Sequence, residues 1–404
     1  MPTWLIPRQD LSIEQLRAVE APADQHQLFV GGPGSGKTQV LLHRADYLRR
    51  TLGVAPDRIQ IFVYTRVLKD YLRSALQLLD LPETCVTTLD SWCIDYYREN
   101  IGGRLPWDAA TKSRDFAEIR QQVKKHLRDH PKHRPFDYAL VDEGQDLDIN
   151  CYKLLKKAAQ HVTVCMDHNQ QIYDSGSKLD EVLKKLDLPR QNLGFLETFR
   201  CSPYIVETAS RFIDEPKERQ HFINQTRTTT TDIETPVYYK SVDWEDTMSD
   251  LIDTVGVRLA RGEKIAILLP QKRQVYGYAK GFSEAGIPVE TPKEVDFNTD
   301  TPKIMPYHSA KGLTFDTVFL PNLSSKGFGR VSPARVRRLL FVGMTRATGW
   351  IYMSKSETAD FDPLDDLNDL IEQKRITIRT QDDHEPPSSD NTLGSQIDDD
   401  LDFL

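Results

Sequence analysis

The stretch Gly31-Gly-Pro-Gly-Ser-Gly-Lys-Thr38 decides the fold of this chain. An apolar segment, residues 27–30, leads into it, and residues 39–50 leave it with helical spacing. A strand, a Gly-x4-Gly-Lys-Thr loop and a helix in this order form a phosphate-binding loop, because glycines let backbone N–H groups approach a triphosphate closely. The stretch therefore predicts an ATP site at the end of a buried strand.

The residue types of the loop predict how it holds ATP and Mg²⁺. Lys37 is expected to be catalytic by reaching the β- and γ-phosphates, and Thr38 is expected to be a Mg²⁺ ligand. The positive end of the following helix dipole faces the same phosphates. The expected nucleotide-binding residues of this segment are Gly31, Gly32, Pro33, Gly34, Ser35, Gly36, Lys37, Thr38 and Gln39.

A carboxylate pair follows a second apolar segment, residues 138–141. This segment reads as a buried parallel strand that delivers Asp142 to the phosphate end of the sheet. Asp142 is expected to hold the Mg²⁺ shell, and Glu143 is expected to orient and deprotonate the attacking water. Together with the loop, the pair predicts a nucleoside-triphosphate hydrolase.

The length and composition indicate a globular protein of two domains with a tail. The chain has 404 residues, of which 39% are hydrophobic. No run approaches the ~20 apolar residues of a membrane span, and the first ten residues lack the features of a secretory signal, so a cytoplasmic, membrane-free protein is expected. The five cysteines include no C-x2-C pair and are expected to be buried thiols.

Charge is distributed unevenly along the chain. The formal net charge is −8, and residues 381–404 contain eight acidic residues and no Lys or Arg, which leaves residues 1–380 formally neutral. The body can therefore carry a basic groove for nucleic acid, and an acidic, disordered C-terminal tail is expected from about residue 381. His126, His130 and His133 lie in a stretch rich in Lys and Arg, which favours a solvated face or a DNA-backbone contact over a metal site.

Alternating strand and helix patterns predict an α/β fold with two doubly wound parallel sheets. A Ser12 to Gln15 capping box predicts the first helix. The predicted strands of the first domain are residues 61–64, 86–88 and 162–166, besides the two above. In the second domain, strands are predicted at residues 237–240, 265–269, 304–307, 318–320 and 350–353, with a helix at 244–261.

Seven ordered blocks of the chain resemble the UvrD/Rep/PcrA group of superfamily 1 DNA helicases. The blocks are residues 11–19, the phosphate loop, Asp142-Glu-Gly-Gln-Asp146, Asp167-His-Asn-Gln-Gln-Ile-Tyr173, Thr198-Phe-Arg-Cys201, His308-Ser-Ala-Lys-Gly-Leu313 and Arg338-Leu-Leu-Phe-Val-Gly-Met-Thr-Arg-Ala347. The resemblance implies two RecA-like domains, residues 1–190 with a short insertion at 93–137 and residues 191–365, followed by a C-terminal segment, 366–404. It also implies an ATP-dependent 3′-to-5′ helicase or translocase on single-stranded or tailed DNA.

The resemblance assigns roles to further residues. Gln15 would read adenine and Phe199 would stack on it, while Gly312 would lie at the nucleotide. Arg200 and Arg346 would contact the γ-phosphate, and Gln170 would couple the nucleotide to DNA. The implied nucleic-acid contacts are Tyr64, Thr65, Arg66, Thr88, Tyr173 and His308.

The chain also departs from the family pattern. Ser175 and Gly176 replace an aromatic residue and an arginine, Thr314 replaces an acidic ribose contact, and Asp90 replaces a histidine. Almost no room remains between residues 290 and 304 for the second-domain insertion of the family.

These departures leave alternatives open. One is a strand-stimulated ATPase that unwinds only with a protein partner, such as a nuclease of a repair or anti-phage assembly, docked through the acidic tail. Another is a nucleotide-gated binding module without translocation. RNA remains an alternative substrate, because stacking and phosphate contacts do not distinguish it from DNA.

Overall fold

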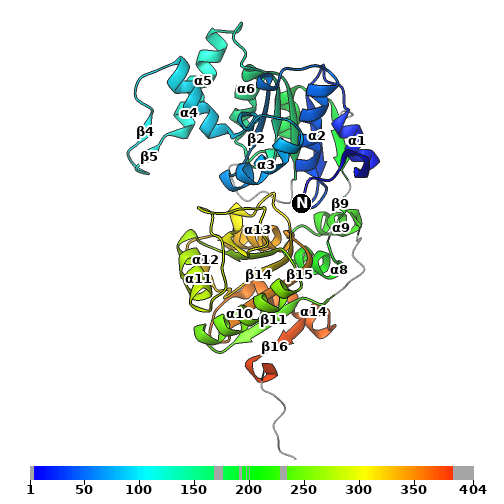
Figure 1. Ribbon diagram of the computed structural model, residues 1–404, viewed down its shortest axis with the longest axis vertical. Coiled ribbons are helices and arrows are strands. Elements are labelled where there is room, and N and C mark those ends of the chain that lie inside the picture. Colours follow the sequence, from blue (N-terminus) through cyan, green and yellow to red (C-terminus); the bar gives the residue numbers. More distant parts are fainter. Residues whose placement is uncertain are drawn as a thin grey trace, which may run out of the picture.

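The computed structural model describes residues 4–167, 176–190, 193–196, 198–199, 201–227 and 234–384. Two α/β domains lie one above the other, with the N-terminal segment at their junction (Figure 1). Each domain contains a six-stranded parallel sheet. The prediction of two doubly wound parallel-sheet domains is therefore confirmed.

The first sheet has the strand order β3-β2-β6-β7-β1-β8. Its all-parallel strands need crossover helices on both faces, which explains why the central strands are largely apolar. The strands are β1 (Gln27–Gly31), β2 (Ile59–Val63), β3 (Val86–Thr88), β6 (Phe136–Val141), β7 (Ala159–Met166) and β8 (Leu193–Leu196).

Side-chain alternation along these strands builds two cores, one on each face of the sheet. Phe29 and Ile61 join the cluster with the helices α2 and α3, whereas Leu28 and Phe62 join the cluster with α4 to α7. The helices and turns are η1 (Arg8–Asp10), α1 (Ile13–Val19), α2 (Lys37–Arg50), η2 (Pro56–Arg58), α3 (Arg66–Leu78), η3 (Glu83–Cys85), α4 (Leu89–Asn100), α5 (Phe116–Asp129), η4 (Gly144–Asp146), α6 (Ile149–Ala158) and α7 (Leu179–Leu186).

The short insertion packs as a helical layer beside the first sheet. Helix α5 contacts both α4 and α6, and a hairpin of β4 (Trp107–Asp108) and β5 (Ser113–Arg114) projects from it (Figure 1). Asp90, which departs from the family pattern, pairs with Arg120 at 2.6 Å and so ties α4 to α5. The departure therefore has a structural function in this chain.

The second sheet has the order β13-β12-β14-β15-β11-β16. Its strands are β11 (Val237–Ser241), β12 (Ile265–Leu269), β13 (Lys303–Pro306), β14 (Phe315–Leu320), β15 (Ala347–Ser356) and β16 (Thr377–Arg379). The surrounding helices and turns are α8 (Pro203–Ser210), α9 (Pro216–Gln225), α10 (Trp244–Ala260), α11 (Lys272–Glu284), η7 (Tyr307–Ser309), α12 (Ser325–Phe328), α13 (Pro333–Met344), η8 (Asp362–Leu367), α14 (Asn368–Glu372) and η9 (Gln381–His384). A short pair, β9 (Thr198–Phe199) and β10 (Thr226–Arg227), lies between the domains in sequence.

Two strands follow an expected domain boundary in sequence but belong to the sheet of the preceding domain. Strand β8 follows residue 190 but pairs with β1, so the first sheet extends beyond that position. Strand β16 follows residue 365 but pairs with β11, so the second sheet takes its edge strand from the C-terminal segment. Both strands are short, and only their partners, far away in sequence, fix them in a sheet.

Local predictions agree well with the structure. The Ser12 to Gln15 capping box is present at the start of α1, and each predicted strand core lies within or overlaps an observed strand. All five cysteines are buried thiols, as expected. Residues 385–404, which hold most of the acidic tail, lie outside the described residues.

Candidate functional site

The phosphate loop is shaped by two glycines in the left-handed region and by Gln15. Gly34 and Gly36 have φ of 78° and 77°, and a Cβ on Gly36 would lie 2.4 Å from the Gln15 amide nitrogen. The Gln15 amide donates to the Ser35 carbonyl at 3.0 Å and accepts from the Ser12 N–H at 2.9 Å. Gln15 therefore braces the loop from α1, and its expected contact with adenine stays a prediction.

Lys37 lies inside the loop. Its Nζ donates to the carbonyls of Gly31 and Gly32 at 2.9 and 3.0 Å, and lies 3.7 Å from the Asp167 carboxylate. The Ser35 hydroxyl is fully buried in the same loop, and within the described parts of the chain it has no hydrogen-bond partner. These are the donor groups that a phosphate would engage.

Thr38 and Asp142 converge as the two expected metal ligands. The Thr38 hydroxyl donates to the Asp142 carboxylate at 2.6 Å, and the other carboxylate oxygen accepts from the Glu143 N–H at 3.0 Å. A hydroxyl and a carboxylate beside a phosphate loop are hard oxygen donors, which Mg²⁺ prefers. The residues present therefore fit a Mg²⁺ ion held between Thr38 and Asp142.

Glu143 is held in a strained conformation at the start of η4. Its φ of 52° and ψ of 44° place a non-glycine residue in the left-handed region, where strain is common at functional sites. The Gln145 side-chain amide donates to the Glu143 carboxylate at 2.5 Å, and its amide oxygen Oε1 accepts from the Asp167 N–H at 2.8 Å. One glutamine therefore fixes Glu143 and joins it to the end of β7.

The second domain delivers a cation, Lys311, to this carboxylate. Its Nζ lies 2.5 Å from Asp146 and 3.5 Å from Glu143, and its side chain is completely buried. The resemblance placed Lys311 within a block but assigned it no role. Its partner lies 165 positions away in sequence, and only the fold brings the two together.

Arg346 reaches the same cleft from the end of α13. It lines the cleft together with Lys37, Thr38, Glu143 and Gly312. Its guanidinium is buried and donates to the carbonyls of Val342 and Leu313 at 3.0 and 3.3 Å. The structure thus brings together the expected loop, carboxylates, Gly312 and Arg346.

The charges in the cleft set the protonation of the carboxylate pair. Burial and the adjacent Glu143 carboxylate raise the pKa of Asp142. Burial acts to raise the pKa of Glu143 as well, but Lys311, Lys37 and Arg346 outweigh it and lower that pKa. The lowered pKa keeps Glu143 ionised at neutral pH, as a general base requires.

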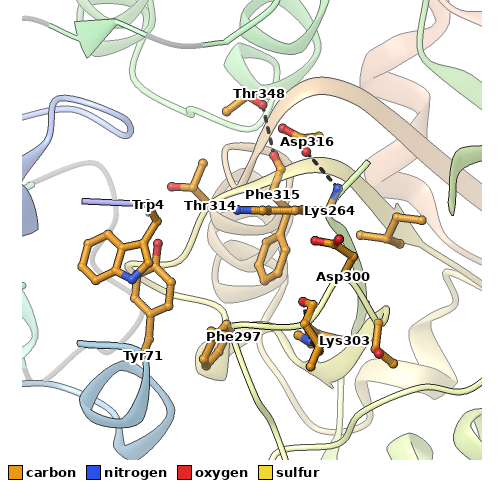
Figure 2. Close-up of a pocket in the computed structure, with 13 residues that line it drawn as sticks. Trp4, Tyr71, Lys264, Phe297, Asp300, Lys303, Thr314, Phe315, Asp316 and Thr348 are labelled. Carbon is orange, nitrogen blue, oxygen red and sulfur yellow. Dashed lines mark hydrogen bonds between the residues drawn. The ribbon is translucent and has the colours of Figure 1, made fainter. Parts of the chain in front are cut away.

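A cavity of about 350 Å³ adjoins the phosphate cleft and shares Trp4, Tyr71 and Thr314 with it. Trp4 stacks on Tyr71 with ring centroids 4.1 Å apart, and Tyr71 meets Phe297 of the second domain edge-on at 4.9 Å. Figure 2 shows Trp4 and Tyr71 on one side of the cavity and Phe315 and Lys264 on the other. The Gln39 side-chain amide donates to the Trp4 carbonyl and accepts from the Ile6 N–H, and these two bonds hold the N-terminal segment here.

The residues expected on the nucleic-acid side lie at strand ends and in a turn. Thr65 and Thr88 cap α3 and α4 through their hydroxyls, and Tyr64 precedes the first cap. Arg66 and His308 have exposed side chains. Their contact with DNA stays a prediction.

Three expected residues lie outside the described residues, namely Gln170, Tyr173 and Arg200. Phe199 belongs to β9 by its backbone. Their roles stay predictions.

Two family descriptions match this chain. Residues 15–175 match the AAA domain family, and residues 290–358 match the UvrD-like helicase C-terminal domain. The chain belongs to the UvrD-like helicases. The chain is accordingly an ATP-hydrolysing DNA helicase.

No curated protein matches this helicase. Among solved structures, the C-terminal domain of a possible DNA helicase from Lactobacillus plantarum WCFS1 is similar, with 16% identity and a TM-score of 0.35. The likeness covers 45% of this chain and 98% of that one. Within the described residues of the helicase, no helix is long and apolar enough to cross a membrane.

Proposed function

We propose that this helicase hydrolyses ATP between its two RecA-like domains and uses the cycle to move 3′ to 5′ along single-stranded DNA. The observation that carries the proposal is the junction of the domains at Glu143, where Lys311 of the second domain lies 3.5 Å from the catalytic carboxylate of the first. A change at the nucleotide therefore changes the contact between domains. The polarity rests on the resemblance to the UvrD/Rep/PcrA group.

The residues of the cleft have distinct parts in hydrolysis. Lys37 exchanges its bonds to the loop carbonyls for the phosphate oxygens, and Arg346 approaches the γ-phosphate from the second domain. Glu143 orients a water molecule and accepts its proton. A Mg²⁺ ion held by Thr38 and Asp142 would neutralise the charge that develops on the phosphates.

The aromatic cavity is the proposed place of the nucleotide base. Thr314 and Trp4 line both the phosphate cleft and this cavity, so a nucleotide with its phosphates in the loop has its base directed toward the cavity. Aromatic faces with a few polar groups are a common lining for such ligands. Trp4 is thus proposed as a stacking residue in addition to Phe199.

The proposal is tested by ATP hydrolysis with and without single-stranded DNA, together with unwinding of 3′-tailed and 5′-tailed duplexes. The Glu143→Gln variant gives the background rate of ATP turnover. Strand-stimulated turnover with unwinding of the 3′-tailed duplex alone is the expected result. Turnover above background that DNA does not stimulate would contradict the proposed coupling.

A partner-dependent motor is the second candidate, and one observation favours it. Between α11 and β13, residues 285–302 form a connection without a helix, so the second domain has no insertion at this position. Strand-stimulated hydrolysis without unwinding of either tailed duplex would establish this candidate. RNA in place of DNA in the same assay tests the remaining substrate question.

A further inference from the structure

A groove on the first domain concentrates positive charge away from the nucleotide cleft. It has a volume of about 790 Å³ and is lined by side chains of α5, α6 and α7, which cover one face of the first sheet. Nine Lys or Arg side chains line it against one carboxylate, Asp187. Helices α5 and α6 lie in the part of this domain remote from the second domain (Figure 1).

The positive charges are close enough to repel one another. The pKa of Lys185 on α7 is lowered, and the largest cause is Lys153 on α6. Asp187 is already paired with Lys156. Charges of one sign gathered this way attract a polyanion over long distances and hold it by releasing counterions.

Stabilisation of the helix dipoles accounts for only some of the lysines that line the groove. Lys156, Lys157, Lys184 and Lys185 lie in the last turns of α6 and α7, where cations stabilise the helix dipole. Lys124, Lys125 and Lys153 lie before the last turns of their helices, and Lys125 and Lys153 are exposed. The helix dipole does not explain the position of these lysines, which complete the groove.

We propose that the α5–α6–α7 groove is a second nucleic-acid site, which binds the phosphate backbone of duplex DNA. None of the described residues lining the groove is aromatic. Single-strand sites combine positive charge with aromatic platforms for the bases, whereas a duplex presents phosphates and keeps its bases stacked inside. A groove of lysines and arginines alone fits the duplex.

This inference goes beyond the proposed function, because it concerns a surface separate from the site of hydrolysis. It gives the helicase a contact with the duplex region that a tailed substrate carries. The contact is independent of base sequence, since lysines recognise phosphates as point charges.

The test compares two triple variants of the full chain. One replaces one exposed lysine on each helix of the groove, Lys125→Glu, Lys157→Glu and Lys184→Glu. The other makes the same charge change on exposed residues elsewhere, Lys217→Glu, Lys240→Glu and Lys280→Glu. Fluorescence anisotropy with a blunt duplex and with a single strand is measured over a series of salt concentrations, and circular dichroism checks folding.

We expect the groove variant to lose on the order of 100-fold in duplex affinity at low salt, with a salt slope smaller by about 3. Its single-strand affinity and strand-stimulated ATP turnover should remain unchanged, and the control variant should bind duplex nearly as well as the natural chain. Retained duplex binding, an equal loss in both variants, or an equal loss of single-strand binding would each overturn the proposal. Failure of strand-stimulated turnover in the natural chain would contradict the proposed function but not this site.

Discussion

Glu143 is the residue on which hydrolysis should depend most. Glu143→Gln keeps the shape of the side chain but removes the base, so turnover should fall about 10²–10⁴-fold. Binding of ATP should persist, because Lys37 and the phosphate loop are unchanged. Steady-state hydrolysis and binding of a fluorescent nucleotide measure the two effects. Equal loss of both would assign Glu143 to binding instead.

The ion pair between Lys311 and Asp146 is buried on both sides. Removing one partner leaves an uncompensated buried charge, so Lys311→Met should lower the free energy of unfolding by about 3–5 kcal/mol. Asp146→Asn should cost less, because Lys311 keeps the Glu143 carboxylate at 3.5 Å, and the double variant should be less destabilised than the sum of the two. Urea unfolding of the natural chain, the two single variants and the double variant gives a double-mutant cycle. Additive losses of unfolding free energy would exclude direct coupling between Lys311 and Asp146.

Because of His26, the free energy of unfolding should depend on pH. Burial and, to a lesser extent, Lys156 lower its pKa to about 4, and its Nδ1 accepts from the Val162 N–H at 2.9 Å. The folded state favours the neutral ring, so its contribution is present above pH ~6.5 and is lost as the pH falls toward 4. The loss should be ~1–2 kcal/mol after solvent screening. His26→Asn retains an acceptor without this titration, and urea unfolding at pH 7 and 5 should show a smaller difference for it.

At the scale of elements, the N-terminal segment should matter to nucleotide binding. Trp4→Ala removes a stacking face, so KM for ATP should rise about 5–10-fold while kcat changes little. Trp4→Phe should recover most of the loss. Trp107→Ala is the matched control, because Trp107 is 58% exposed in the β4–β5 hairpin. An unchanged KM in Trp4→Ala would remove Trp4 from the base site.

Sequence patterns predicted most elements because their signals are local. Glycines and Lys37 mark the loop, apolar runs mark the buried strands, and Ser12 with Gln15 marks the first helix. Strands β8 and β16 were assigned to other segments, since a strand of three or four residues is fixed by its partners. Lys311 and Trp4 were missed as site residues for the same reason, because their contacts are made only in the folded chain.

At the scale of the whole molecule, the two domains share an apolar core. One cluster of buried side chains continues from Leu68 of α3 to Leu313 of the second domain, and a Cβ on Gly312 would lie 2.9 Å from Leu68. Such a shared core favours unfolding as one unit. Differential scanning calorimetry should therefore show a single transition, and two resolved transitions would indicate domains that unfold independently.

The buried cysteines have a practical consequence for following domain motion. Cys85 and Cys151 are buried, and burial raises the pKa of each thiol to about 11, while Cys93, Cys165 and Cys201 are buried as well. Thiols of this kind are inert toward alkylating dyes, since the thiolate is the reactive form. A cysteine introduced on the surface of each domain would then be labelled selectively in the natural background. Fluorescence transfer between two such dyes would report opening and closing of the cleft during turnover.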